Sequence, residues 1–552
     1  MGAVVGAGDR RRGTAAGLFG AALLVAGTVL GSGGGAYAQP SPPAGGHSAG
    51  HGEDGKKHDG GDGDRGGDRG HDRGGDQGRN RVGAAEPTGP TGAAGPSTTP
   101  PPGTPPAGPA GSPTGTSATP AAGRPAPVAG AVLASAEAGP GAALPTAQGL
   151  QQALAAALAD RNLGTVSFAV ADAADGRVLY GSGENAPATP ASTTKLATTV
   201  AALSLIPGDT RLATRVVKGA NPGEITLVGG GDPTLTALPA DQVQIGGAPA
   251  DADTAPASLE ALARQTAAAL KAAGTTAVKL DYDLSLYAGS PQHKNYDAAN
   301  IALVTPLMID EGKVDPKSRE DAPARVADPA GQAADAFAAQ LKAQGITVDG
   351  KAKPAAAPAA ATAPVLGRVD SPTVARLVER LLTTSDNTLA EAIARQAALA
   401  AHQPASFEGA ATAVTQELAR LGVPMTGVVL GDGSGLSTGN AIPPAVLVQL
   451  LALASSEQHP TLRPVLTGLP IAGFTGTLGK RFGAGSGAAE AAGLVRAKTG
   501  SLNGVNTLAG TVVDAEGRLL AFAVMTKTTA AADTARAAMD RVVARLAACG
   551  CH

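Results

Sequence analysis

Three short motifs, far apart in the chain, restrict its fold more than any other feature. Ser192 and Lys195 come just after Pro190, a residue that favours the start of a helix, and their spacing places them side by side on its first turn. The other two motifs are Ser385-Asp386-Asn387 and Lys498-Thr499-Gly500. This set, in this order, is typical of serine enzymes that use a lysine as the base. A fold that unites the motifs must bring the start of a helix next to a strand.

The side chains of these motifs predict a nucleophile and its proton carriers. Ser192 needs a base, and Lys195 can serve only when its amine is partly neutral. Burial lowers the pKa of a lysine, and so does a second cation nearby, for which Lys498 is the candidate. We expect Ser385 to relay protons, and Asn387 to hydrogen-bond Lys195 or the substrate amide.

The strand that carries Lys498 is the predicted substrate-binding element. Thr499 is suited to hold a substrate carboxylate beside that lysine. An oxyanion hole needs two preorganised N–H groups, and those of Ser192 and of Ser501, directly after Gly500, are the candidates. The N–H groups of an edge strand also suit a peptide-like substrate.

A competing motif, Gly435-Leu436-Ser437-Thr438-Gly439, matches the G-x-S-x-G pattern of hydrolases with a Ser-His-Asp triad. That nucleophile needs a strand before it and a helix after it, whereas Ser437 follows a glycine-rich loop. The same pattern also occurs in Gly46-His47-Ser48-Ala49-Gly50, within low-complexity sequence. We therefore reject a triad and expect ordinary surface positions for His293, His402 and His459.

The N-terminal quarter of the chain is predicted to lie outside the folded domain. Arg10, Arg11 and Arg12 precede an apolar run and an Ala36-Tyr37-Ala38 cleavage site, so residues 1–38 are predicted to be a signal peptide, with an uncleaved anchor as the alternative. Residues 39–143 are low in complexity and typical of a disordered linker. We expect a secreted protein associated with the cell wall or with the outer surface of the membrane.

Composition excludes several other functions. A net charge of −3 and a pI near 6.3 give no reason to expect nucleic acid as a partner. Cys549 and Cys551 are the only cysteines, so there is no disulfide framework. With His552 they form an incomplete zinc-ligand set, so the tail 549–552 is expected to be frayed or closed by a local disulfide. No metal and no cofactor is predicted.

Apolar periodicity predicts an α/β fold with one five-stranded antiparallel sheet flanked by helices. Two strands are expected early in the chain and three near its end: Thr165–Ala171, Arg177–Tyr180, Leu494–Lys498, Asn506–Val513 and Arg518–Thr526. A nucleophile-bearing helix is expected from Ser192 to Leu205.

The catalytic domain is predicted to be interrupted by a smaller inserted domain. Residues 144–205 and 369–548 form its two parts, and residues 206–368 form the insertion. Within the insertion we expect strands at 214–218, 224–228 and 276–283 and helices at 258–273 and 331–344. An Ala-Pro-rich linker at 353–364 leads back to the catalytic domain.

Several further stretches resemble the DD-peptidases of peptidase family S13, the class C low-molecular-mass penicillin-binding proteins. The resemblance runs from about Leu144 to Thr526 and includes Leu227–Leu235, Asp432–Ser437 and Leu469–Gly473, besides the three motifs. In that family a large insertion separates the first two motifs. The insertion here is short for the family, so the family's third small domain is expected to be reduced or absent.

The resemblance implies a penicillin-binding-protein/β-lactamase-like transpeptidase fold and a serine-type D-Ala-D-Ala carboxypeptidase, often with endopeptidase activity. It implies that Ser192 attacks the D-Ala–D-Ala carbonyl of peptidoglycan stem peptides, and that water then deacylates the enzyme with Lys195 as the base. It also implies that β-lactam antibiotics acylate the serine as covalent inhibitors.

Two other functions use the same motifs. A serine β-lactamase would need a carboxylate to activate the deacylating water, and Glu391, one turn after Asn387, is expected to be a helix-surface residue instead. A wall-bound penicillin-binding scaffold or sensor would keep the fold without turnover, but the intact motif residues argue against it.

Overall fold

The computed structural model describes residues 143–552, apart from 246–247, 319 and 321. The predicted signal peptide and almost all of the predicted linker therefore lie outside the described residues.

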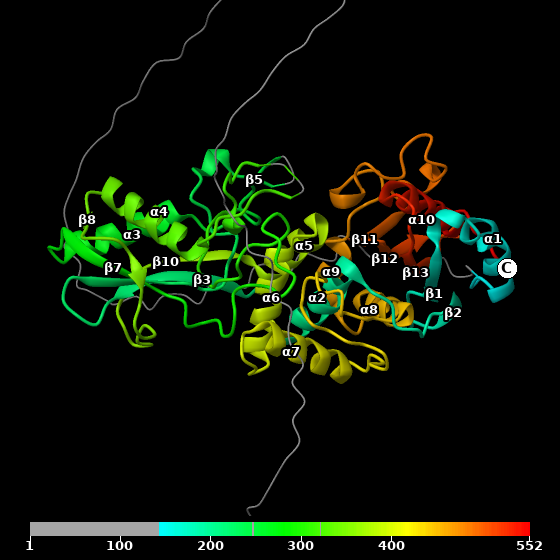
Figure 1. Ribbon diagram of the computed structural model, residues 1–552, viewed down its shortest axis with the longest axis horizontal. Helices are drawn as coiled ribbons and strands as arrows, with labels where there is room; N and C mark the ends of the chain where they lie inside the picture. The colour runs from blue at the N-terminus through cyan, green and yellow to red at the C-terminus, as the bar shows by residue number, and fades with distance from the viewer. Residues whose placement is uncertain (1–142, 246–247, 319, 321) are drawn as a thin grey trace, which may run out of the picture. The chain divides into compact units, whose positions relative to one another are not determined.

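A five-stranded antiparallel sheet is the centre of the catalytic part, with the strand order β11-β12-β13-β1-β2 (Figure 1). Its strands are β1 (Thr165–Asp172), β2 (Val178–Ser182), β11 (Val495–Leu502), β12 (Val505–Val513) and β13 (Leu519–Lys527). The early strands join the late ones because β1 pairs with β13. The sheet confirms the predicted fold class, and β11, which carries Lys498, lies at its edge.

Both faces of this sheet are buried at its central strands β1, β12 and β13, where successive residues are buried. On β1, Phe168 and Val170 face one core cluster, whereas Ala169 and Ala171 face another. Helices α1 (Ala147–Leu158) and α10 (Ala532–Ala547) cover the face with the larger side chains. The alanine face allows α2 (Thr194–Leu205) and α8 (Pro444–Ser455) to pack close to the sheet.

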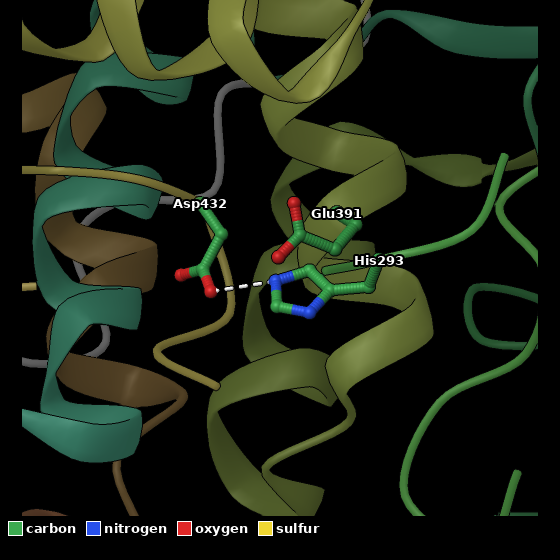
Figure 2. Close-up of side chains that lie close together, drawn as sticks. All are labelled: His293, Glu391 and Asp432. Atoms are coloured by element: carbon green, nitrogen blue, oxygen red, sulfur yellow. Dashed lines mark hydrogen bonds and ion pairs between the residues drawn. The ribbon is translucent and has the colours of Figure 1, made fainter. Parts of the chain in front are cut away.

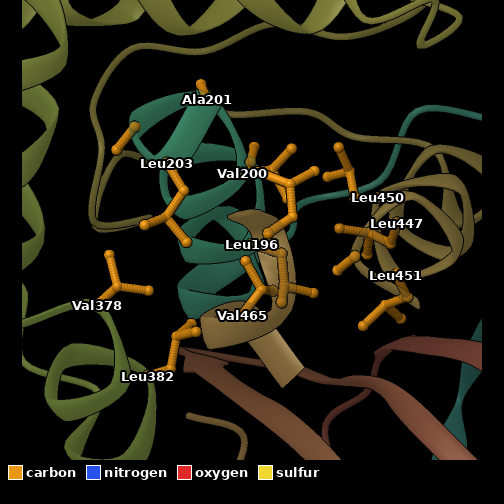
Figure 3. Close-up of a cluster of buried hydrophobic side chains, with 14 of the residues drawn as sticks. Leu196, Val200, Ala201, Leu203, Val378, Leu382, Leu447, Leu450, Leu451 and Val465 are labelled. Carbon is orange, nitrogen blue, oxygen red and sulfur yellow. The ribbon is translucent and has the colours of Figure 1, made fainter. Parts of the chain in front are cut away.

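Helix α2 runs through the middle of the larger core cluster. Every residue from Thr194 to Leu203 is buried, including the polar Thr194, Lys195, Thr198 and Thr199, which are hydrogen-bonded. Figure 3 shows Leu196 and Val200 among side chains of the surrounding helices. The labelled neighbours come from α5 (Val374–Thr384), α8 and α9 (Arg463–Thr467). The same cluster also contains residues of α6 (Asn387–Ala400) and α7 (Phe407–Arg420). A helix enclosed in this way is a rigid support for the residues at its N-terminus.

The inserted region has its own sheet and its own core. The order β10-β3-β4-β7-β8 describes the main path of this six-stranded sheet, and β9 also pairs with β7. The strands are β3 (Arg211–Lys218), β4 (Glu224–Val228), β7 (Ala277–Asp283), β8 (Thr347–Val348), β9 (Lys353–Pro354) and β10 (Val365–Thr373). Helices α3 (Leu259–Ala272) and α4 (Pro329–Ala343) pack on it through leucines, alanines and Phe337. Two short strands, β5 (Gln244–Ile245) and β6 (Ala248–Pro249), pair with each other.

Strand β10 differs from the expected pattern at the end of the insertion. It pairs antiparallel with β3, with Val369 opposite Thr214, and the boundary expected at residue 368 lies inside this strand. Gly367 and Pro372 interrupt the alternation of apolar residues that predicts a strand, so the sequence alone gave no sign of it. The expected linker also contains β9, which pairs with β7.

The C-terminal tail is folded against the catalytic part. Cys549 and Cys551 form a disulfide and are buried in the same core cluster as α1 and α10. The backbone N–H of Thr146 donates to the carbonyl of Cys551 at 2.7 Å, which joins the two ends of the described chain. Of the two expectations for the tail, the local disulfide is the one observed. Among the described residues, no helix has both the length and the apolar character needed to span a bilayer.

Candidate active site

The first motif lies at the N-terminus of α2. Residues Ala191–Thr193 form a 3₁₀ turn and the regular helix begins at Thr194, so Ser192 lies just before the helix and not within it. Lys195 is fully buried, and its Nζ lies 3.0 Å from the Oγ of Ser192. The same Nζ donates to Oδ1 of Asn387 and to the carbonyl oxygen of Ser434, both at 2.6 Å. The lysine therefore has a fixed position beside the serine hydroxyl.

The second motif forms the turn between α5 and α6. Ser385 adopts a left-handed conformation with φ of 60°, which ends α5. Asp386 then caps α6, since its side chain accepts from the N–H of Leu389 at 2.8 Å. Asn387, the first residue of α6, donates from Nδ2 to the carbonyl of Asn300 at 3.0 Å. The turn thus presents Ser385 and Asn387 to the site, while a segment of the insertion fixes the amide.

The third motif completes the site from β11. Lys498 is fully buried and its Nζ donates to Oγ of Ser385 at 2.8 Å and to the carbonyl of Thr499 at 2.7 Å. The structure therefore gathers the motif side chains into two hydrogen-bonded groups, one of Ser192, Lys195 and Asn387 and one of Ser385 and Lys498. The charge of Lys195 acts on Lys498, so the two groups lie at one site.

Burial governs the protonation of both lysines. Burial lowers the pKa of Lys195 to about 8, although Asp432, Glu391 and Asp386 oppose the shift. Burial and the charge of Lys195 lower the pKa of Lys498 well below its usual range. Two partly neutral amines at one site suit the transfer of protons at neutral pH.

The predicted substrate-binding residues lie along β11. Thr499 Oγ1 donates to Oγ1 of Thr477 at 2.8 Å, and Ser501 Oγ accepts from Nη2 of Arg536 at 3.1 Å. At Gly500 a Cβ would come within 2.9 Å of the backbone nitrogen of Ser192. Only a glycine lets the edge strand approach the nucleophile this closely. The contact brings the backbone of β11 next to the backbone nitrogen of Ser192.

A buried cluster behind Lys195 contains two side chains that were predicted to lie on the surface. Figure 2 shows His293, from the insertion, Glu391, from α6, and Asp432, from the loop before α8. Glu391 was expected on a helix surface and His293 on the protein surface, but both are buried. Helix α6 is enclosed by α2, α7 and the insertion, and that packing is invisible in local periodicity. The only signal near them was the stretch Asp432–Ser437.

The cluster holds a loop, residues 432–437, that we term the lysine-facing loop. Glu391 accepts from the N–H groups of Gly433, at 3.1 Å to each oxygen, and Ser434, at 2.8 Å. Asp432 accepts from the N–H groups of Gly435 and Ser437 at 2.8 and 2.6 Å. The remaining contacts of Asp432 are with Asn440 and with Nε2 of His293, both at 2.8 Å. These bonds fix the Ser434 carbonyl that accepts from Lys195.

The same three side chains resemble a metal-ligand set in geometry but not in surroundings. Their ligand atoms lie within 4.8 Å of one another. However, several N–H groups point at the two carboxylates, and Nδ1 of His293 accepts from the N–H of Asn295 at 2.9 Å. Donors of this kind suit anions and not a cation. The cluster is therefore built to position the loop.

Ser437, the competing nucleophile, lies in this same loop. Its N–H donates to Asp432 and its Oγ accepts from the N–H of Gly439 at 3.2 Å. The loop continues to α8, so no strand-to-helix turn presents the hydroxyl. Of the other histidines, His402 is exposed and His459 is half-buried.

The fold and the three convergent motifs define a penicillin-binding/β-lactamase-like serine enzyme. A crystal structure of penicillin binding protein 4 from Haemophilus influenzae has the same fold, with a TM-score of 0.55 and 20% sequence identity over 71% of this chain and 97% of that one. The chain belongs to the D-Ala-D-Ala carboxypeptidase 3 (S13) family of serine-type carboxypeptidases, whose sequence profile matches residues 150–325 and 316–546.

Curated relatives agree with this assignment. Carboxypeptidase DacB of Mycolicibacterium smegmatis is 37% identical over 416 residues, which cover 74% of this chain and 85% of that protein. A D-alanyl-D-alanine carboxypeptidase of Actinomadura sp. is 28% identical over 417 residues, covering 64% of this chain and 76% of that protein.

Proposed function

We propose that this protein removes the terminal D-Ala from peptidoglycan stem peptides through an acyl-enzyme on Ser192. The observation that carries the proposal is the pair of Ser192 and Lys195, with 3.0 Å between Oγ and Nζ and an amine whose pKa burial lowers to about 8. Lys195 takes the serine proton as Oγ attacks the carbonyl of the D-Ala–D-Ala bond, and D-Ala leaves with that proton on its amine. Water then releases the shortened peptide, with Lys195 again the base.

The second amine and hydroxyl support the departure of D-Ala. Lys498 donates to Ser385 Oγ at 2.8 Å, so that hydroxyl can pass a proton toward the leaving nitrogen. The N–H groups of Ser192 and Ser501 are assigned to the tetrahedral oxyanion. Lys498, Thr499 and Ser501 bind the carboxylate of the terminal residue.

A β-lactam presents a carbonyl and a carboxylate at a similar separation, so we propose that it acylates Ser192 as a covalent inhibitor. Rapid release would require a carboxylate beside the deacylating water. The oxygens of Glu391 accept N–H groups of the lysine-facing loop, which leaves that carboxylate in a positioning role. A long-lived adduct is therefore expected, and fast turnover of penicillin would favour a β-lactamase.

The substrate lies in the cell wall, which requires export of the chain. We propose that residues 1–38 direct secretion and that residues 39–143 tether the catalytic part within the wall. Mass spectrometry of the secreted protein tests the first point, since cleavage predicts an N-terminus at Gln39.

The direct test of the activity uses defined muropeptides and mass spectrometry. A pentapeptide stem should lose one D-Ala with the wild type and remain intact with Ser192→Ala. Cross-linked dimers in the same assay measure endopeptidase activity. Uptake of penicillin without release of D-Ala from any muropeptide would instead support the scaffold or sensor function.

A further inference from the structure

The lysine-facing loop connects the buried acidic cluster to the base. Its Ser434 carbonyl accepts from Lys195 Nζ at 2.6 Å, while the N–H of the same residue donates to Glu391 at 2.8 Å. One peptide segment therefore has the catalytic amine on one side and a buried carboxylate on the other. A separate anchor, Oγ1 of Thr198, donates to the carbonyl of Gly433 at 2.7 Å.

We propose that Glu391 is a positioning residue for acylation, which fixes the Ser434 carbonyl and whose negative charge holds the proton on Lys195. This inference rests on the proposed function of Lys195 as the base. Glu391 touches neither Ser192 nor the expected substrate-binding residues of β11, so it acts through the loop.

Hydrogen bonds to Glu391 stabilise its ionised form, against a pKa that burial raises. Three N–H contacts reach its two oxygens, and these stabilise a carboxylate more than a carboxylic acid. Burial and the neighbouring Asp432 raise the pKa of Glu391, while His293 lowers it. Since Nδ1 of His293 accepts from Asn295, its Nε2 is the protonated nitrogen and donates to Asp432.

Three carboxylates and one lysine act on the protonation of Lys195. Asp432, Glu391 and Asp386 each favour the ammonium form, and burial opposes them. The fourth group is Lys498, whose own pKa is lowered by the charge of Lys195. Removal of one carboxylate charge should therefore leave Lys195 neutral at a lower pH.

The first test measures the rate at which a fluorescent penicillin acylates Ser192, as a function of pH. Glu391→Gln is expected to move the acid limb of the profile to lower pH by about one unit, and to reduce the plateau rate by about tenfold because the loop loses part of its support. Thr198→Val removes an anchor of the same loop but no charge, so it should lower the plateau and leave the midpoint unchanged. Glu408→Gln, at an exposed site on α7, should change neither.

The second test measures Lys195 itself, without any substrate. A ¹³C-labelled lysine ε-carbon signal, identified by its absence in Lys195→Met, should titrate at lower pH by about one unit in Glu391→Gln. If Glu391→Gln does not fold, Asp432→Asn removes another of the three carboxylate charges that act on Lys195 and should shift the same signal in the same direction.

The outcomes separate this inference from the proposed function. If fluorescent penicillin did not label Ser192 of the wild type, the proposed function would be contradicted. The titration of Lys195 would still test whether the charge of Glu391 acts on that lysine. A midpoint in Glu391→Gln equal to that of the wild type, by either measurement, would overturn the inference and leave Glu391 as a structural residue only.

Discussion

At the scale of single residues, the chemistry depends on how one buried lysine is held. The Nζ of Lys195 donates hydrogen bonds to three oxygen acceptors, on Ser192, Asn387 and Ser434. A protonated amine has three N–H groups, one for each acceptor, so these contacts favour the ammonium form of Lys195. The serine is activated only in the fraction of molecules in which the amine is neutral. That balance makes acylation sensitive to pH.

For the wild type, the rate of acylation by penicillin should rise with pH and be half-maximal near pH 8, where burial places the pKa of Lys195. The sign follows from the mechanism, because a base must be neutral to accept the serine proton. Stopped-flow fluorescence between pH 5 and about 10 covers the range over which a lysine with a lowered pKa titrates. A rate that falls through this range would exclude Lys195 as the base.

The motif residues could be found from the sequence because their spacing along helix and strand is local. Ser192 and Lys195 are three positions apart, and so meet wherever a helix begins there. Glu391 and His293 could not be placed, since their burial depends on packing between the insertion, α6 and the loop at Asp432. Their short-range neighbours, such as Ala390 and Ala392, show no pattern that marks the acid as buried.

At the scale of elements, the site is a junction between the turn at Ser192 and the edge strand β11. The close approach is also held by a hydrogen bond, since Oγ1 of Thr507 donates to the carbonyl of Pro190 at 2.8 Å. Gly500 sits at this contact, where a Cβ would come within 2.2 Å of the same hydroxyl oxygen.

Gly500→Ala should therefore lower the acylation rate by about 100-fold, because an added methyl group moves β11 away from the nucleophile. Gly483→Ala is the matched control, since a Cβ there meets nothing within 4 Å and the position has no positive φ. A Gly500→Ala rate within twofold of the control would mean that the junction tolerates the shift.

Helix α2 is packed in the core and begins directly after the turn that carries the nucleophile, so core packing holds Ser192 in place. Leu450 of α8 is fully buried in the cluster around α2, and Leu450→Ala should reduce the free energy of unfolding by about 2–5 kcal/mol. Leu519, at the exposed start of β13, is the control, because its substitution by alanine should cost less than about 1 kcal/mol. Urea unfolding followed by circular dichroism compares the two, and equal losses would show that the cluster is not the core of this part.

At the scale of the whole molecule, the insertion completes the catalytic site instead of standing apart from it. Asn300 accepts from Asn387, His293 bonds to Asp432, and Asn295 Nδ2 donates to the carbonyl of Leu436 at 2.9 Å. The sequence predicted an inserted domain. It did not predict these contacts with the catalytic part, because they join segments far apart in the chain and no local sequence pattern marks them. The central strands β1, β12 and β13 of the five-stranded sheet were predictable because each carries its own apolar run, which β10 lacks.

Arg395 of α6 is a buried link between the insertion and the catalytic part. Its guanidinium is buried, donates to the carbonyls of Ala288, Ser290 and Ala405, and lies 4.5 Å from the ring centre of Phe407. Arg395→Met leaves three carbonyls without their donor, so it should cost about 2–4 kcal/mol of stability and slow acylation. Thermal unfolding and penicillin labelling measure both effects.

The control for that link is Arg368→Met, at an exposed arginine paired with Asp370 on its own strand. Its stability should stay within about 0.5 kcal/mol of the wild type. Acylation at the wild-type rate in a folded Arg395→Met protein would show that the insertion is not needed to hold the site.

The central claim is that the three motifs form one acylating site with Ser192 as the nucleophile. The most direct measurement is peptide mapping by mass spectrometry after incubation with penicillin. The expected result is a single penicilloyl adduct on the peptide that contains Ser192, absent in Ser192→Ala and retained in Ser437→Ala. An adduct on Ser437, or labelling that persists in Ser192→Ala, would contradict the account.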